Sequence, residues 1–564
     1  MSEVKNGEIF PLMDLYFNQH KIVYSHQFDT FHQFMDDIIF HELKNNPNKF
    51  FEKKDGNLIY SYRLEFDDIA IKPPMFEIDD EVMYPEDARR KHASYFSKLV
   101  ATVRQVQDII DIQTDQVTTR EIGKETEVPV ARIPIMVKSK YCTTNLRKND
   151  PHTECRYDPG GYFIVNGGEK VIVCQERMCD NKIMVFSKKD TSFKDNITYT
   201  AQVNSKANCY NGLVQITTIK MKKDASLVLS TSIFNEIPIF IFLRAMGLET
   251  DKDIFKYIIY DLTDVDMINV LRNSMTKCVD DEGRPILSQD DAMNYLFTKV
   301  NQYNFPVDSD PVNRQNQIRQ ALTKMLSKDI IPHMGNSNTI LSTTMLKKAY
   351  YIGYMAHRLL NCYLRRVDPD DRDSFINKRI DTPGYLLGYL FKQYFNKMLN
   401  ELGKHFKRKN NNDREPINII NQIKPNIIEQ GMKSGLSTGA WGITKSKKGV
   451  AQTLNRLNYL QTISNLRKLV APSLDSSTNK VTSIRHIHGI QYGFVCPVET
   501  PEGESIGVVK NLSTTSNISL LLLTQLPIIR KILKKSNLVI NLGQCKSEEL
   551  KNHVKVFVNG EWLG

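Results

Sequence analysis

The chain has 564 residues, of which 41% are hydrophobic and 25% are charged, a balance that is ordinary for a globular protein. Because this length exceeds what one hydrophobic core organises, we expect several domains. Lys and Arg number 75 against 64 Asp and Glu, for a formal net charge of +11. This modest basic excess fits a partner with a phosphate backbone, but many proteins without such a partner are equally basic.

Several protein classes are disfavoured. The nine cysteines are scattered, and the pair Cys174 and Cys179 has no second pair nearby, so no zinc ribbon is predicted. An odd, unpatterned set of cysteines indicates reduced thiols. The first residues lack the apolar segment of a secretory signal. The apolar stretches at 233–242 and 518–533 are interrupted by proline and fall short of the ~20 residues of a membrane span, so we expect a soluble protein.

In chain order, the first clear elements are short strands at 133–137 and 161–165, which are flanked by turn residues. Alternating Thr, Val and Ile residues over 195–225, around Asn211-Gly212, predict a β-hairpin. Residues 250–350 are predicted to be mostly helical.

The strongest helical pattern covers residues 385–404, and a second helix is predicted over 450–469. The basic run at 404–409 follows the first of these helices. It either contacts phosphate groups or forms a solvated helix end whose cations oppose the helix dipole, and both interpretations stay open. Residues 405–416 are predicted to be an exposed connection.

An acidic run at 368–373 looks at first like a calcium-binding loop. Arg372 occupies the third ligand position, and no glycine stands at the sixth, so calcium binding is not predicted. No phosphate-binding P-loop, dinucleotide-binding or H-E-x-x-H motif occurs. We expect the carboxylates of the run to form turns and to pair with Arg365, Arg366 and Arg372.

The most informative stretch is residues 485–512, which combines cations, imidazoles, carboxylates, glycines and prolines. Proline removes backbone donors and glycine weakens regular elements, so this composition predicts an irregular loop that presents polar groups at a working surface. His486 and His488 alternate as on a strand. No third ligand stands at a metal-site spacing, which favours hydrogen-bonded packing over metal binding.

This stretch closely resembles the fork region of the second-largest (beta-type) subunit of multisubunit DNA-directed RNA polymerases. Its motifs are similar to those of the eukaryotic, archaeal and large-DNA-virus type of this subunit. Ala440 stands where the family favours Asn, Asn204 where it has Arg, and Lys468 where it often has Arg, whose planar fork Lys cannot reproduce. Further segments similar to the family's signatures occur in order at 85–89, 133–139, 160–170, 175–178, 237–247, 332–335, 370–379, 438–442, 449–456, 464–468 and 556–560.

The resemblance implies a fold class, α+β and multidomain, and a division into five segments. These are a protrusion (1–190), a lobe (191–345), a return segment of the protrusion (346–415), a fork (416–515) and the start of an external region (516–564).

The resemblance also implies an activity. The complete enzyme is a nucleotidyltransferase that extends RNA between two Mg²⁺ ions, and these are held mainly by the largest subunit. We therefore assign no catalytic or metal-binding residue to this chain and expect it to be inactive alone. The family's nucleotide-contacting lysines and zinc site belong to a C-terminal half that is missing from this sequence, so we expect either a split subunit or a gene fragment.

The expected partners are the largest subunit, the C-terminal half of the second-largest subunit, small assembly subunits, the DNA template and the RNA transcript, without a membrane. A non-catalytic nucleic-acid-binding or assembly scaffold and a truncated orphan product remain alternatives. The Asn-, Ile- and Lys-rich composition favours a large DNA virus as the source. Localisation is then the virion and host cytoplasm, or the nucleus if the enzyme is cellular.

The resemblance also implies roles for individual residues. Arg485 and Glu502 are expected beside the active centre, although Glu499 and Glu502 alternatively cap backbone amides in a turn. Nucleic-acid contacts are expected from Gln452, Asn455, Arg456, Arg467, Lys468 and Lys510. Structural roles are expected for Asp371, Arg372, Asp373, Lys378 and Arg379.

Overall fold

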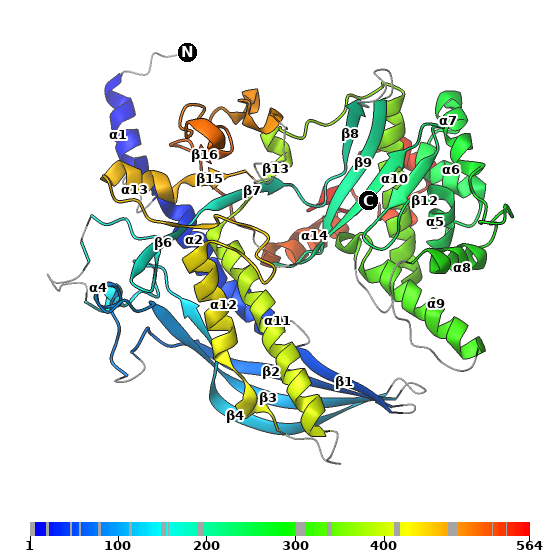
Figure 1. Cartoon of the computed structure of the whole chain (residues 1–564). Coiled ribbons are helices and arrows are strands. Elements are labelled where there is room, and N and C mark those ends of the chain that lie inside the picture. Colours follow the sequence, from blue (N-terminus) through cyan, green and yellow to red (C-terminus); the bar gives the residue numbers. More distant parts are fainter. Residues whose placement is uncertain are drawn as a thin grey trace. The chain divides into compact units, whose positions relative to one another are not determined.

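The structure is a computed structural model. It describes residues 6–17, 22–44, 48–55, 58–76, 80–111, 116–147, 154–155, 157–189, 197–210, 212–300, 311–335, 341–410, 418–471, 482–521, 523–536 and 538–564. Helices and several separate sheets make up the chain, so the predicted α+β class is confirmed (Figure 1). No helix among these residues is long and apolar enough to cross a membrane.

The chain divides into two compact units, each assembled from two separate stretches. Unit 1 comprises Met1–Arg177 and Lys378–Leu520, and unit 2 comprises Met178–Asn377 and Leu521–Gly564. The boundaries of the five segments expected from the sequence remain a prediction.

Unit 1 contains a four-stranded antiparallel sheet on which helices pack. The strands run in the order β1 (Lys49–Asp55), β2 (Leu58–Ile71), β3 (Phe96–Asp111) and β4 (Val117–Pro134). The helices of this unit are α1 (Asn6–Phe17), α2 (Ser25–Gln33), α3 (Ile39–Lys44), α4 (Pro85–Arg90), α11 (Pro383–Asn410), α12 (Pro425–Thr438) and α13 (Tyr459–Leu466).

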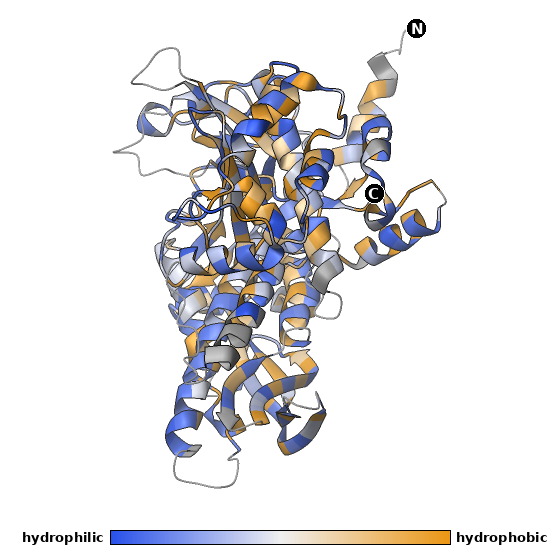
Figure 2. Cartoon of the chain, turned by 90° about the vertical axis from the view of Figure 1, so that its right-hand side faces the viewer, coloured by the Kyte–Doolittle hydropathy of each residue, from blue (hydrophilic) through white to orange (hydrophobic). Residues whose placement is uncertain are grey.

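The sheet has one apolar and one polar face, as the period of two of a strand requires. On β2, Tyr62, Leu64 and Phe66 are buried, whereas Arg63 and Glu65 between them form an ion pair. The alternation appears as changing colour along the strands (Figure 2). Phe406 of α11 packs on the apolar face, with its ring centroid 4.6 Å from that of Tyr62.

Two small sheets join distant segments of unit 1. One has the order β14 (Ala451–Thr453), β6 (Gly168–Ile172), β5 (Phe163–Val165). In the other, β15 pairs parallel with β7 and antiparallel with β16. The order of this second sheet is β13 (Lys378–Asp381), β7 (Cys174–Met178), β15 (Lys468–Val470), β16 (Val509–Asn511).

Some sequence predictions for unit 1 need correction. The helix expected over 385–404 is confirmed and extends to Asn410 as α11, so 405–410 is not part of an exposed connection, and 411–416 lies outside the described residues. The strand expected at 133–137 ends at Pro134, and the one expected at 161–165 begins at Phe163.

The single helix expected over 450–469 is wrong, because this segment forms β14, α13 and β15. Its leucines match a helical spacing by coincidence, since Leu457 and Leu460 are exposed. Val450 and Ala451 are instead buried beside β6. The helix starts only after Asn458, whose side chain accepts a hydrogen bond from the Gln461 N–H at 2.8 Å and caps it.

Unit 2 joins a five-stranded antiparallel sheet to helices around one hydrophobic core. The predicted hairpin is confirmed as the pair β9 and β10, although Asn211 lies outside the described residues. The predicted helical character of 250–350 is also confirmed for the described part. The strands are β12 (Ile237–Pro238), β11 (Leu227–Ser230), β10 (Val214–Met221), β9 (Ile197–Lys206) and β8 (Met184–Lys189).

The helices of unit 2 are α5 (Ile239–Ala245), α6 (Asp251–Ile259), α7 (Val265–Met275), α8 (Gln289–Lys299), α9 (Pro311–Lys328), α10 (Leu341–Tyr363), α14 (Leu526–Lys535) and α15 (Ser547–Asn552). A two-stranded sheet of β17 (Phe557–Val558) and β18 (Glu561–Trp562) completes the unit.

Candidate nucleic-acid interface

A buried carboxylate lies at the centre of the sheet that carries the fork. Glu176 on β7 is 4% exposed. It accepts a hydrogen bond from Lys510 of β16 at 2.9 Å and another from Lys378 of β13. One negative charge thus serves two ammonium groups in a site largely removed from water. Because the three residues come from three separate parts of the sequence, this triad ties β16, at the end of the loop at 485–512, to β7 and β13.

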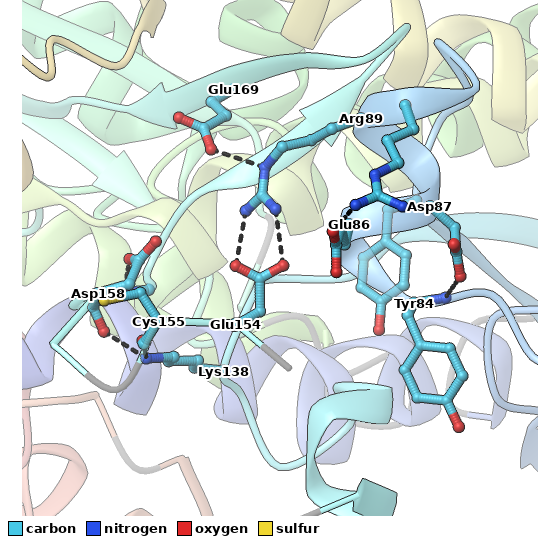
Figure 3. Close-up of polar contacts among 12 residues, drawn as sticks. Tyr84, Glu86, Asp87, Arg89, Lys138, Glu154, Cys155, Asp158 and Glu169 are labelled. Atoms are coloured by element: carbon cyan, nitrogen blue, oxygen red, sulfur yellow. Dashed lines mark hydrogen bonds and ion pairs between the residues drawn. The ribbon is translucent and has the colours of Figure 1, made fainter. Parts of the chain in front are cut away.

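A second set of ion pairs, here called the arginine network, lies beside β6. It begins at α4, where Pro85 occupies the first helical position and acidic residues fill the first turn, both favourable at a helix N-terminus. Arg89 in the last turn spans two carboxylates, donating to Glu154 at 2.6 and 3.0 Å and to Glu169 at 2.8 Å (Figure 3).

Arg456 completes this network from the segment between β14 and α13. Its guanidinium donates to both oxygens of Glu169 and, at 2.9 Å, to Asp158. The Tyr162 ring lies beneath both cations, 5.1 Å from the Arg456 guanidinium and 5.9 Å from that of Arg89. Such contacts add cation–π attraction to the ion pairs.

The titration of the network follows from its charges. Burial by itself would raise the pKa of Asp158, but the Gly160 N–H and the Arg456 guanidinium hold that pKa below its ordinary value. The pKa of Arg89 rises even though burial opposes it, because Glu154 and Glu169 stabilise the cation. Both arginines are therefore engaged by carboxylates of this network.

Arg467 follows α13 and is buried, with 6% of its surface exposed. Its guanidinium donates to the carbonyl oxygens of Val23, Leu512 and Ser513. Burial lowers the pKa of this group. The expected role of Arg467 as a nucleic-acid contact stays a prediction, but this geometry makes it a clamp that joins the N-terminal segment to the end of the fork.

His26 on α2 lies beside this clamp and gives unit 1 a predicted pH dependence. Burial, assisted by the charge of Arg467, lowers the pKa of His26 from 6.5 to about 4. His26 therefore binds a proton near pH 6.5 in the unfolded chain but only near pH 4 in the folded chain. In this window the free energy of unfolding is expected to fall by about 1.4 kcal/mol per pH unit as the pH is lowered, and not to respond above it.

Fluorescence measures this dependence in unit 1 alone, because the two tryptophans, Trp441 and Trp562, belong to different units. Denaturant unfolding of Trp562→Phe, with and without His26→Gln, gives the two slopes against pH. In the His26→Gln variant, the slope of the unfolding free energy against pH is expected to be smaller by about 1.4 kcal/mol per pH unit, which is the contribution of one proton. Equal slopes in both proteins would show that His26 is not held neutral.

The loop at 485–512 is held by hydrogen bonds between its own side chains and its own backbone. Arg485 donates to the carbonyl oxygens of Glu504 at 2.6 Å and Ile506 at 2.9 Å. The Thr500 hydroxyl donates to Val509 O and accepts from Gly507 N. Gly507 has φ +69°, and a Cβ there would lie 2.4 Å from Arg485 O, so glycine is required at this position.

The acidic residues of the loop differ in their contacts. Glu502 is exposed, and among the described residues its side chain forms no ion pair with Arg485, which donates to backbone carbonyl oxygens instead. Glu499 accepts a hydrogen bond from the Ser464 hydroxyl at 2.6 Å, a contact that differs from the expected amide cap. Arg485 and Glu502 therefore lie on the same loop without neutralising each other.

The outer surface of this loop is unusually apolar. Tyr492 and Val498 are 85% and 83% exposed, and Ile487 and Phe494 are also exposed. Exposed apolar groups that gather on one surface mark interaction surfaces, and these four residues belong to one loop. Because the loop is also held by internal hydrogen bonds, it presents these groups in a fixed arrangement.

The remaining residues expected to contact nucleic acid lie near one another. Lys468 on β15 is half-buried, burial lowers its pKa, and it donates to Gln452 of β14 at 3.5 Å. Asn455 accepts from the Leu457 N–H at 3.0 Å and shapes the turn before α13. Lys510, by contrast, is buried against Glu176. Direct nucleic-acid contacts of these residues stay predictions.

The acidic run at 368–373 is held by other partners than those expected. Asp370 pairs with Arg358 at 3.0 Å and accepts from the Val185 N–H. Arg366 pairs with Asp264, so its expected pairing with the run is wrong.

The residues expected to be structural are placed as follows. Asp371 accepts from the Asp373 N–H at 2.8 Å, and Arg372 lies 4.2 Å from the Phe186 ring centroid. Lys378 binds Glu176, and Arg379 donates to the carbonyl oxygen of Lys378 at 2.8 Å.

The described residues include no group of three or more His, Cys, Asp or Glu side chains arranged to hold a metal ion. Sequence reasoning missed the roles of Arg89, Glu154, Glu169 and Glu176. Each stands in or beside a motif of the family, but spacing along the chain does not reveal that these charges converge.

Comparison with known proteins shows which family the chain belongs to. The family described as "RNA polymerase beta subunit" matches residues 22–430, and "RNA polymerase Rpb2, domain 3" matches residues 452–518. The chain belongs to the family of RNA polymerase beta subunits.

Its relatives come from a virus, eukaryotes and archaea. The chain is 42% identical, over 98% of its length, to DNA-directed RNA polymerase subunit 2 of Acanthamoeba polyphaga mimivirus, of which it covers 46%. It is 32% identical over its whole length to DNA-directed RNA polymerase II subunit 2 of Arabidopsis thaliana, covering 47%. With subunit Rpo2 of Saccharolobus solfataricus it shares 30% identity over 87% of this chain and 41% of that protein. The chain thus spans about half the length of these relatives.

Proposed function

We propose that this chain works inside a DNA-directed RNA polymerase as part of its second-largest subunit. The observation that carries the proposal is the loop at 485–512, an exposed element that is held by internal hydrogen bonds. It lies in a chain that matches this family over residues 22–430 and 452–518. In this role the chain builds one wall of the DNA cleft, and its protrusion and its lobe each face the DNA. The fork lies beside the active centre, where the template strand is read.

The chain supplies architecture, not bond-forming groups. It acts together with the largest subunit, small assembly subunits and the portion of the second-largest subunit that corresponds to the rest of the relatives' length. Mg²⁺ is held mainly by the largest subunit, and the family's zinc site belongs to that remaining portion. The net charge of +11 supports sequence-independent binding of nucleic-acid phosphates. A viral enzyme of this kind works in the virion and host cytoplasm, and a cellular one in the nucleus.

Within the fork we propose a division of labour. Arg485 and Glu502 border the nucleotide site and steer its closing elements, while Gln452, Asn455 and Lys468 face nucleic acid. Arg456, Arg467 and Lys510 hold the fork in place through the arginine network, the carbonyl clamp and Glu176. The burial of Arg467 and Lys510, and the contacts of all three residues within unit 1, support this assignment.

The experiment is reconstitution of the polymerase from this chain and its proposed partners, assayed by primer extension on a DNA template. Extension is expected only when this chain is present. Arg485→Ala is expected to assemble normally and to slow elongation by about tenfold, equivalent to about 1.4 kcal/mol in the barrier. Arg90→Ala, an exposed arginine outside the fork, is the matched control.

Two outcomes would contradict the proposal. Full extension without this chain would remove it from the enzyme. Unchanged elongation by Arg485→Ala, with intact assembly, would remove the loop from the neighbourhood of the active centre.

A further inference from the structure

A small cavity lies between the last turns of α11 and the start of α12, which run side by side in unit 1 (Figure 1). Its volume is about 210 Å³. The floor is apolar and the rim is charged. The floor consists of Met398, Leu402 and Ile427, and the rim of Glu401, Lys404, His405, Arg408, Gln422 and Lys424.

The rim carries an excess of positive charge. Lys404, Arg408 and Lys424 face a single carboxylate, Glu401, and none of the three has an ion-pair partner within the described part of the chain. Lys424 is also the residue that precedes α12, and no side chain caps this helix. The positive end of the helix dipole therefore adds to the field at the same rim.

One buried polar atom at the rim lacks a partner. The Nδ1 atom of His405 is removed from solvent and makes no hydrogen bond with any described group. Buried polar atoms in folded proteins are nearly always hydrogen-bonded, so this atom is an exception, but because solvent does not reach it, it is not a contact point for a ligand.

The walls of the cavity are held in place by close packing. At Gly431 of α12, a Cβ would lie 2.4 Å from the Tyr394 ring of α11, so the two helices make their contact without space to spare. Phe406 is fixed between the rings of Phe50 and Tyr62. A ligand therefore meets a cavity formed in advance, which lowers the entropic cost of binding.

The size and lining select the class of ligand. The volume is below the ~300 Å³ at which sites for whole small molecules begin, so it holds about one side chain. A nucleic-acid phosphate would use the cations but has no need of an apolar floor. We propose that the cavity binds an acidic peptide segment of a partner protein. One apolar side chain lies on the floor, and flanking carboxylates pair with Lys404, Arg408 and Lys424.

The test uses the full chain and a fluorescent peptide with a central leucine flanked by aspartates. Binding is expected, and it should weaken by at least about tenfold in Arg408→Glu/Lys424→Glu. The matched control is Lys407→Glu/Lys409→Glu, which makes the same charge change on exposed residues of the same helix end that do not line the cavity. This control is expected to keep affinity within about twofold.

Two further arms keep the proposal falsifiable. A peptide with glycine in place of leucine is expected to bind about tenfold more weakly, because it leaves the floor empty. If the charge-reversed protein does not fold, as judged by circular dichroism, Arg408→Gln/Lys424→Gln replaces it.

The proposal would be overturned if both charge-reversed proteins lost the same affinity for the peptide, or if replacing the leucine of the peptide by glycine did not weaken binding. The absence of peptide binding would overturn it as well. Binding of single-stranded DNA that is lost only in Arg408→Glu/Lys424→Glu, without peptide binding, would instead identify a phosphate site.

Discussion

Replacing Glu176 by glutamine is expected to lower the free energy of unfolding of unit 1 by about 3–5 kcal/mol. The carboxylate is 4% exposed and lies between Lys378 and Lys510, which are themselves largely buried. Glutamine keeps the shape but removes the charge, so two ammonium groups in a poorly solvated site each lose their ion pair with Glu176. Removing one partner of a buried ion pair costs far more than an exposed pair contributes.

Denaturant unfolding of Trp562→Phe followed by Trp441 fluorescence measures this loss in unit 1. Glu127→Gln is the control, because its exposed pair with Lys72, with the glutamate side chain 76% exposed, is expected to change stability by less than about 0.5 kcal/mol. A loss below about 1 kcal/mol for Glu176→Gln would mean that water reaches the triad and that it does not secure the fork.

Removing Arg89 is expected to have the second large effect. Arg89→Ala leaves Glu154, whose side chain is 8% exposed, without the cation that binds both of its oxygens, and it leaves Glu169, 15% exposed, with Arg456 as its remaining cation. The expected loss is about 3–5 kcal/mol of unfolding free energy. Arg456→Ala is expected to cost less, about 1–2 kcal/mol, because its side chain is 41% exposed and solvent screens its charge.

Trp441 fluorescence again provides the measurement. The neighbouring Arg90, 75% exposed and paired only with Glu86 within its own helix, is the matched control and is expected to change stability by less than about 0.5 kcal/mol as alanine. If Arg90→Ala and Arg89→Ala were equally destabilising, the loss would come from α4 itself, and the network would have no special role.

The sequence predicted the elements whose signal is local. Helix α11 carries a sustained apolar period, and the pair β9 and β10 has the alternation of a hairpin, so both are confirmed. The helix predicted over 450–469 is wrong because both ends of this segment are strands. These strands are held by hydrogen bonds to β6 and β7, which lie far away in the sequence. A helical spacing of leucines cannot reveal such pairing.

The site was less accessible to sequence reasoning. Family motifs drew attention to Lys510 and Arg456 as basic residues, but only the fold shows that Glu176 and Glu169 bind them. Burial decides whether a cation meets a phosphate or an internal carboxylate, and burial is a property of the packed chain. For the same reason the cavity beside α11 could not be distinguished from a solvated helix end.

The most direct test of the central claim uses a photoreactive nucleotide in the template strand of a stalled, reconstituted elongation complex, placed opposite the growing end of the RNA. Crosslinked peptides are then identified by mass spectrometry. The fork account predicts crosslinks within residues 485–512. Two results would contradict it. One is that this chain is crosslinked only within unit 2, and the other is that it is not crosslinked at all although the largest subunit is.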